Sequence, residues 1–181
     1  MLFQHGSGRR AQKRRTSWYD PAMVCAEGEK ILSELDDCGI RYLRRERLVW
    51  SGFGPVNRVE PDVSLSDFGP ELHDYGLRRL KVEDPEKLRK FFLSLLWRAS
   101  VSRLPEMGEV KLDAADEEKL TSYLRGDTTL PLSFYPCWLT QHHQVGFTHN
   151  HTPVRQVKEF PGSDGSSSKS VPIYRFYFDG W

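Results

Sequence analysis

The chain has 181 residues, of which 38% are apolar and 28% are charged, and its formal net charge is +1. This composition predicts a folded domain with one sizeable core, and it excludes both a disordered chain and an acidic mimic of nucleic acid. No apolar run approaches the about 18 residues that a membrane span requires, so we expect no membrane partner. Three widely spaced cysteines and an N-terminus without a signal-peptide pattern predict a cytoplasmic protein.

The charges form blocks along the chain. Residues 1–19 and 77–103 each carry a net charge of +5, whereas residues 51–76 and 104–127 each carry −4. Such blocks predict separate basic and acidic surfaces on the folded protein.

The first expected helix follows Asp20, because Asp is a good N-cap and Pro21 suits the first turn. Apolar residues at helical spacing extend the helix to about Arg47, and Gly39 predicts a break within it. The stripe consists of Ile31, Leu32, Leu35, Tyr42 and Leu43.

Two further helices carry clear start signals. Asp84 and Pro85 begin a helix that extends to about Ser102, and its apolar residues lie on more than one side, which predicts a central position. Asp113 caps the third helix, and Gly126 ends it.

Beyond residue 128 the pattern changes to short segments rich in aromatic and β-branched residues, which indicate strands. The expected strands are residues 132–139, 144–148, 154–160 and 173–178, with a flexible Gly/Ser loop at 162–170.

These elements predict an α+β fold in which N-terminal helices, with a central apolar helix, pack on a small C-terminal antiparallel sheet. Residues 1–17 are expected to form a basic flexible arm. Residues 18–181 are expected to form a single domain, helical over about 18–127 and β-rich over about 128–181.

Cations near aromatic rings are the candidate binding residues, since cations neutralise phosphates and rings stack on unstacked bases. The predicted contacts to nucleic acid or to a protein partner are Arg9, Arg10, Lys13, Arg14, Arg15, Trp18, Arg78, Arg79 and Lys81. Arg98, within the central helix, would suit a phosphate clamp, but we favour an ion pair with a carboxylate. Asp36 and Asp37 would suit a cation, but we favour a solvated helix end.

Cys25 and Gly28 have the spacing of a zinc knuckle whose second cysteine is replaced by glycine. A structural zinc needs about four N or S ligands, and one thiolate does not provide them. We therefore predict no metal and no cofactor.

The C-terminal histidines offer an alternative metal site. His149 and His151 would share one face of a strand, and His142 or His143 would supply a third ligand across a hairpin. A solvated polar loop tip is the commoner setting for such residues, and it is the interpretation that we favour.

Several segments of the chain resemble a family of uncharacterised bacterial and prophage HNH-endonuclease-like proteins. The similar segments are residues 14–27 (RRTSWYDPAMVCAE), 35–37 (LDD), 92–102 (FLSLLWRASVS), 153–155 (PVR) and 174–180 (YRFYFDG). Complete members carry a Cys-x-x-Cys knuckle with a His-containing catalytic stretch, and a second Cys-x-x-Cys later. The 181 residues hold neither the first knuckle nor that stretch, and Cys25 alone represents the second. The resemblance therefore implies the scaffold and a mobile-element origin without the nuclease reaction.

Three functions follow from these features. The first is a catalytically inactive HNH-derived protein that binds nucleic acid or a nucleoprotein complex through basic patches. The second is a phage-encoded, anti-CRISPR-like inhibitor that binds a bacterial defence protein. The third is an active metal-dependent nuclease that uses the C-terminal histidines.

Overall fold

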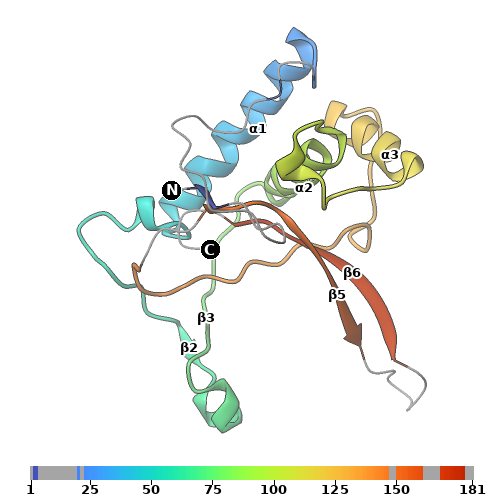
Figure 1. Cartoon of the computed structure of the whole chain (residues 1–181). Coiled ribbons are helices and arrows are strands. Elements are labelled where there is room, and N and C mark those ends of the chain that lie inside the picture. The colour runs from blue at the N-terminus through green and yellow to red at the C-terminus, as the bar shows by residue number, and fades with distance from the viewer. Residues whose placement is uncertain (1, 4–19, 21–22, 147–149, 161–167, 178–181) are drawn as a thin grey trace.

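The computed structural model describes residues 2–3, 20, 23–146, 150–160 and 168–177 (Figure 1). Within these residues the chain forms three α-helices and three pairs of short strands, so the predicted α+β class is confirmed. None of the described helices is long and apolar enough to cross a bilayer.

Helix α1 (Ala26–Arg45) begins later than predicted. Cys25 is its N-cap, with an extended backbone, whereas the carboxylate of Asp20 accepts hydrogen bonds from the backbone N–H of Arg103 (3.0 Å) and the hydroxyl of Ser102 (3.3 Å). Asp20 therefore ties the preceding chain to the end of α2 (Pro85–Val101) instead of capping α1.

The predicted break at Gly39 is also wrong, because α1 continues through this residue without interruption. Gly39 is buried, and a Cβ built on it would lie 2.3 Å from the ring of Phe91 in α2. The glycine therefore allows the two helices to approach closely, and it does not end a helix.

The caps of the other two helices are confirmed. The Asp84 carboxylate accepts a hydrogen bond from the backbone N–H of Lys87 (2.9 Å) at the start of α2. Asp113 does the same for Asp116 (2.8 Å) at the start of α3 (Ala114–Arg125), and Gly126 ends α3 in the left-handed conformation with φ of 90°.

Helix α2 is the central element, as predicted. It contacts α1 on one side and α3 on the other, and it contributes to both clusters of the core. One cluster is Leu35, Leu93, Leu96, Ala99, Val110, Leu120, Tyr123 and Leu124. The other is Tyr42, Leu43, Leu48, Val49 and Phe91.

The largest pair of strands is an antiparallel ribbon of β5 (Val154–Phe160) and β6 (Lys169–Arg175). The bounds predicted for β5 are confirmed, whereas β6 begins four residues before its predicted start at Ile173. Lys169 and Ser170, assigned by sequence to the Gly/Ser loop, therefore belong to a strand, and residues 161–167 lie outside the described part of the chain.

Two smaller pairs complete the strands of the described residues. β2 (Val63–Ser64) pairs antiparallel with β3 (Gly76–Leu77), and β1 (Leu2–Phe3) pairs parallel with β4 (Asn150–His151).

The other two predicted strands are corrected by the structure. Residues 132–139 form turns and coil. The guanidinium of Arg89 donates to the carbonyls of Leu130 (2.9 Å) and Pro131 (2.7 Å), just before this segment, and of Phe134 (3.0 Å) within it, so a side chain and not a neighbouring strand satisfies these carbonyls. In the segment predicted as strand 144–148, only Gln144 forms a bridge, to Arg58, and residues 147–148 lie outside the described part.

Two elements project from the helical body on the same side (Figure 1). One is residues 62–77, which contain β2, β3 and two 3₁₀ turns at Ser66–Phe68 and Pro70–Leu72, and which we call the hairpin. The other is the β5–β6 pair, which we call the ribbon. The helices therefore supply most of the core, and the outer parts of the hairpin and the ribbon form surfaces beyond it.

Candidate nucleic-acid interface

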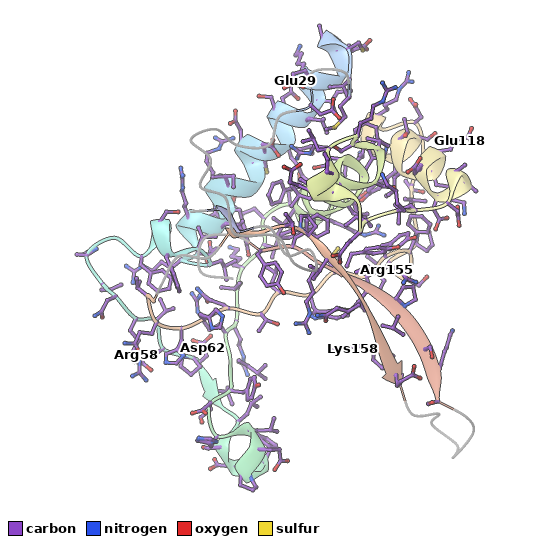
Figure 2. All side chains as sticks on the ribbon, viewed as in Figure 1. Glu29, Arg58, Asp62, Glu118, Arg155 and Lys158 are labelled. Atoms are coloured by element: carbon purple, nitrogen blue, oxygen red, sulfur yellow. The ribbon has the colours of Figure 1, made fainter. Side chains whose placement is uncertain are left out.

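One face of the ribbon collects cations. Directly opposite residues of an antiparallel pair share a face, as do alternate residues along one strand. Phe160 of β5 lies opposite Lys169 of β6, so these two side chains share a face. Lys158, two residues before Phe160, and Arg175, six residues after Lys169, lie on that face too. Gln156 lies there as well. We call this surface the basic face. Figure 2 shows Lys158 further along the ribbon than Arg155.

The three cations of the basic face are free to meet a ligand. Lys158, Lys169 and Arg175 are exposed, and none of them takes part in the ion pairs between described residues. The single acidic residue within the described part of the ribbon, Glu159, lies on the opposite face, where it accepts a hydrogen bond from Ser170 (2.5 Å). The basic face is therefore positive without a competing carboxylate of its own.

The base of the ribbon is fixed to the helical body. Ile173 is buried, and the hydroxyl of Tyr174 donates to the carbonyl of Lys111 (3.1 Å). The outer half is free, since the side chains of Val157 and Phe160 are 53% and 45% exposed. Ile173 belongs to the same face as the three cations, so this face is closed at Ile173 and open on either side of it, with Lys158 and Lys169 in the outer half and Arg175 at the base.

Tyr135 contacts the base of the ribbon, where its ring packs against the ring of Tyr174 with the centroids 6.3 Å apart. Its hydroxyl donates to the carboxylate of Asp116 (2.9 Å), which also binds Lys119 (3.0 Å). The hydrogen bond from Lys119, followed by that from Tyr135, lowers the pKa of Asp116. Burial, with the bond to Asp116, raises the pKa of Tyr135 well above its ordinary value, so this hydroxyl remains a donor at neutral pH.

The structure places the residues predicted from sequence in three settings. The guanidinium of Arg78 donates to the carbonyls of Glu46 (2.8 Å) and Arg47 (3.3 Å) and to the side chain of Gln141 (2.8 Å), so it caps the end of α1 and is not available to a ligand. Arg79 and Lys81 are exposed. The remaining candidates lie outside the described residues, namely Arg9, Arg10, Lys13, Arg14, Arg15 and Trp18.

Arg98 forms the ion pair that the sequence favoured, with both oxygens of Asp36. Asp36 therefore belongs neither to a cation site nor to a solvated helix end, because it lies within α1 and faces α2. Asp37, next to it, is exposed.

The altered zinc knuckle is part of a helix. Cys25 is exposed at the N-cap of α1, and Gly28 lies in its first turn, where an added Cβ would be 3.0 Å from the Cβ of Val24. Within the described part of the chain, no three His, Cys, Asp or Glu side chains come together as metal ligands.

The alternative metal site at the C-terminal histidines, which the sequence did not favour, is not tested by the described residues. His142 and His143 are exposed, and the backbone carbonyl of His143 accepts a hydrogen bond from the N–H of Val59 (2.8 Å). His149 and the side chain of His151 lie outside the described part of the structure.

The hairpin has the opposite character to the ribbon. Val63 lies opposite Leu77, and Tyr75 precedes Leu77 by two residues, so these three side chains form an apolar stripe. Phe68, at the tip, is 71% exposed, and Tyr75 is 57% exposed. Residues 62–77 contain no Lys or Arg, and their acidic residues are Asp62, Asp67, Glu71 and Asp74.

Sequence reasoning missed both projecting surfaces. The basic face depends on the register of β5 with β6, and Lys169 lies in a stretch whose Gly/Ser composition indicates a loop. The exposed Phe68 and Tyr75 lie among Gly and Pro residues that predict irregular structure. The two-residue spacing of Lys158 and Phe160 in the predicted strand 154–160 indicates that these two side chains share a face, and it was a signal for the basic face.

Comparisons of the chain with protein-family models, with curated proteins and with solved structures find no match.

Proposed function

We propose that this protein is a catalytically inactive, HNH-derived protein of a mobile element that associates with nucleic acid, alone or within a nucleoprotein complex, in the cytoplasm. The observation that supports this proposal is the basic face of the ribbon, where Lys158 and Lys169 are exposed in the outer half and Arg175 at the base, with no acid of the ribbon on the same face. The exposed Arg79 and Lys81, and the basic residues of segment 1–17, would add sequence-independent attraction.

A two-stranded ribbon is a suitable shape for this contact. The major groove of B-DNA, about 12 Å wide, admits such a ribbon. Cations at its edges would meet phosphates, and the amide of Gln156 would reach base edges. Phe160, on the same face, would stack on an unpaired base in a single strand. The ribbon therefore supports binding to either form of nucleic acid.

The test compares neighbouring cations on opposite faces of β5. Lys158→Gln removes a charge from the basic face, and Arg155→Gln removes one from the other face. Binding of the full chain to a duplex and to a single strand is measured by fluorescence anisotropy over a range of salt concentrations. One lost phosphate contact should reduce the slope of log affinity against log salt by about 0.9 on duplex.

We expect Lys158→Gln to weaken binding and reduce this slope, and Arg155→Gln to leave both nearly unchanged. Equal effects of the two variants would mean that the ribbon contributes only diffuse charge. No binding by the unaltered chain would remove the proposed function altogether.

The hairpin favours a second candidate function, that of an anti-CRISPR-like inhibitor that binds a bacterial defence protein. Exposed aromatic and apolar side chains with an acidic surround are typical of a protein-binding surface. The test is affinity purification of the full chain from the host cell, with and without nuclease treatment. A defence protein that co-purifies after nuclease treatment, and is lost with Phe68→Ser, would support this function.

A further inference from the structure

The hairpin and the ribbon are complementary in charge. The hairpin carries four acidic residues and no Lys or Arg. The described part of the ribbon carries four basic residues and one acidic residue, and that acid lies on the face opposite the three cations of the basic face. Each element also exposes an aromatic ring, Phe68 at the tip of the hairpin and Phe160 at the outer end of β5.

The two elements leave the body on the same side and diverge, so that their outer ends lie apart in one chain (Figure 1). A two-fold axis running between them, perpendicular to both, would place the hairpin of one copy beside the ribbon of the other. The same rotation would create a second, identical contact. Such an arrangement is closed and self-complementary, which is the commonest symmetry of homodimers.

We propose that two copies of this chain associate reciprocally, with the acidic hairpin of each copy docked on the basic face of the other copy's ribbon. Asp67, Glu71 and Asp74 are exposed acids of the hairpin, and the Asp74 carboxylate lies 3.1 Å from Nε2 of His73. In the proposed dimer these acids would meet Lys158, Lys169 and Arg175. The cations would also lie against the rings of Phe68 and Tyr75, where cation–π contacts would add to the attraction.

This dimer uses the surface that we propose for nucleic acid, so the two ligands exclude one another. A duplex added to the dimer should compete for Lys158, Lys169 and Arg175 and release monomers. Association itself requires no nucleic acid, and it is therefore measured on protein freed of nucleic acid. Failure of the dimer would leave nucleic-acid binding intact, and failure of nucleic-acid binding would leave the dimer intact.

The experiment is sedimentation equilibrium of the full chain at low and high salt. We expect a concentration-dependent dimer at low salt that dissociates as salt screens the charges. The triple variant Asp67→Lys/Glu71→Lys/Asp74→Lys should be monomeric, and so should Lys158→Glu/Lys169→Glu/Arg175→Glu. A control that reverses three exposed acids of α1, Glu27→Lys/Glu34→Lys/Asp37→Lys, should still dimerise.

The decisive measurement is an equimolar mixture of the two monomeric triple variants. In that mixture both reciprocal contacts again join opposite charges, so a heterodimer should form although neither variant dimerises alone. A misfolded variant would not regain association in this way. As an independent variant, Phe68→Ser should weaken the dimer while leaving every charge in place.

The proposal would be overturned if the unaltered chain stayed monomeric at low salt at every concentration. It would also be overturned if the mixture of the two triple variants stayed monomeric. Dimerisation that persists in both triple variants would place the interface elsewhere. The pure chain could instead be monomeric while a bacterial defence protein slows amide exchange of the hairpin residues. That result would assign the hairpin to the defence protein and would overturn the dimer.

Discussion

The guanidinium of Arg98 in α2 donates to both carboxylate oxygens of Asp36 in α1, with N–O distances of 2.8 and 2.5 Å. The same side chain also reaches the hydroxyl of Ser94 (2.9 Å) and the backbone carbonyl of that residue (3.3 Å). Two helices that are far apart in sequence are thus joined by a planar, two-point contact at the rim of the core. This geometry is specific to arginine, because a lysine offers a single charged nitrogen.

The first prediction concerns this pair. Asp36→Asn should lower the free energy of unfolding by about 1–3 kcal/mol, between the values for exposed and buried pairs, because both partners are partly exposed. Asp37→Asn, at the exposed neighbour, should change it by less than about 0.5 kcal/mol. Urea unfolding followed by circular dichroism measures both. Equal stabilities of the two variants would show that the pair contributes nothing.

Gly39→Ala is expected to act against the usual rule for helices. Replacing an interior helical glycine by alanine normally stabilises a protein by about 1 kcal/mol. Here the new Cβ would lie 2.3 Å from the Phe91 ring, so α1 and α2 must separate. We expect a net loss of about 1–3 kcal/mol, as for other overpacked cores. Ser33→Ala, at an exposed position of the same helix, serves as the control for propensity and should be neutral or slightly stabilising.

Acid should destabilise the protein partly through Asp116. The pKa of this carboxyl is lowered in the folded state, so its contribution to stability is present above its unfolded pKa and is lost as pH falls through its folded pKa. Tyr135→Phe removes one hydrogen bond to the carboxylate. The variant should be less stable than the unaltered chain at neutral pH, and the difference should shrink toward low pH. Thermal unfolding at several pH values tests this, and a constant difference would contradict it.

Zinc content provides a fourth prediction. Several ligands must act together to hold a structural zinc, and Cys25 has no second cysteine at position 28. The purified protein should contain well below one zinc per chain and should remain folded in chelator. Stoichiometric zinc that is lost together with thermal stability would redirect attention to His142, His143, His149 and His151.

The fifth prediction is that magnesium, manganese and zinc support no cleavage of plasmid or single-stranded DNA. Metal-assisted cleavage needs an ion held by fixed ligands and a positioned base, and within the described part of the chain no three His, Cys, Asp or Glu side chains come together to hold one. Cleavage that disappears in His149→Ala/His151→Ala would establish the third function, an active nuclease.

Local capping signals in the sequence were sufficient to predict where two of the helices begin. Asp84 and Asp113 begin α2 and α3 because each carboxylate meets a backbone N–H three residues later, and that contact is local. Asp20 carries the same local signal, but a distant partner, the N–H of Arg103, takes its carboxylate. Gly39 is similar, because its role depends on Phe91, which a reading of α1 alone does not reveal.

The β-rich C-terminal part was less predictable for the same reason. Apolar residues in 132–139 indicate a strand, but the three hydrogen bonds from Arg89 satisfy nearby carbonyls in a different shape. The candidate interface depends on register, which no local pattern specifies. Lys158 and Lys169 share a face only because β6 starts within the Gly/Ser stretch.

The separation of a helical core from two projecting surfaces has a consequence for how amide protons exchange with solvent. Amides of α2 around Leu93 and Leu96, which lie in the core, should exchange only through global unfolding. Amides of the hairpin, whose two strands are two residues long each, should open locally at little cost. Exchange should therefore divide this small chain into a slow helical unit and a fast outer unit. Mutations that accumulate in the fast unit would alter what the protein binds while leaving its folding intact.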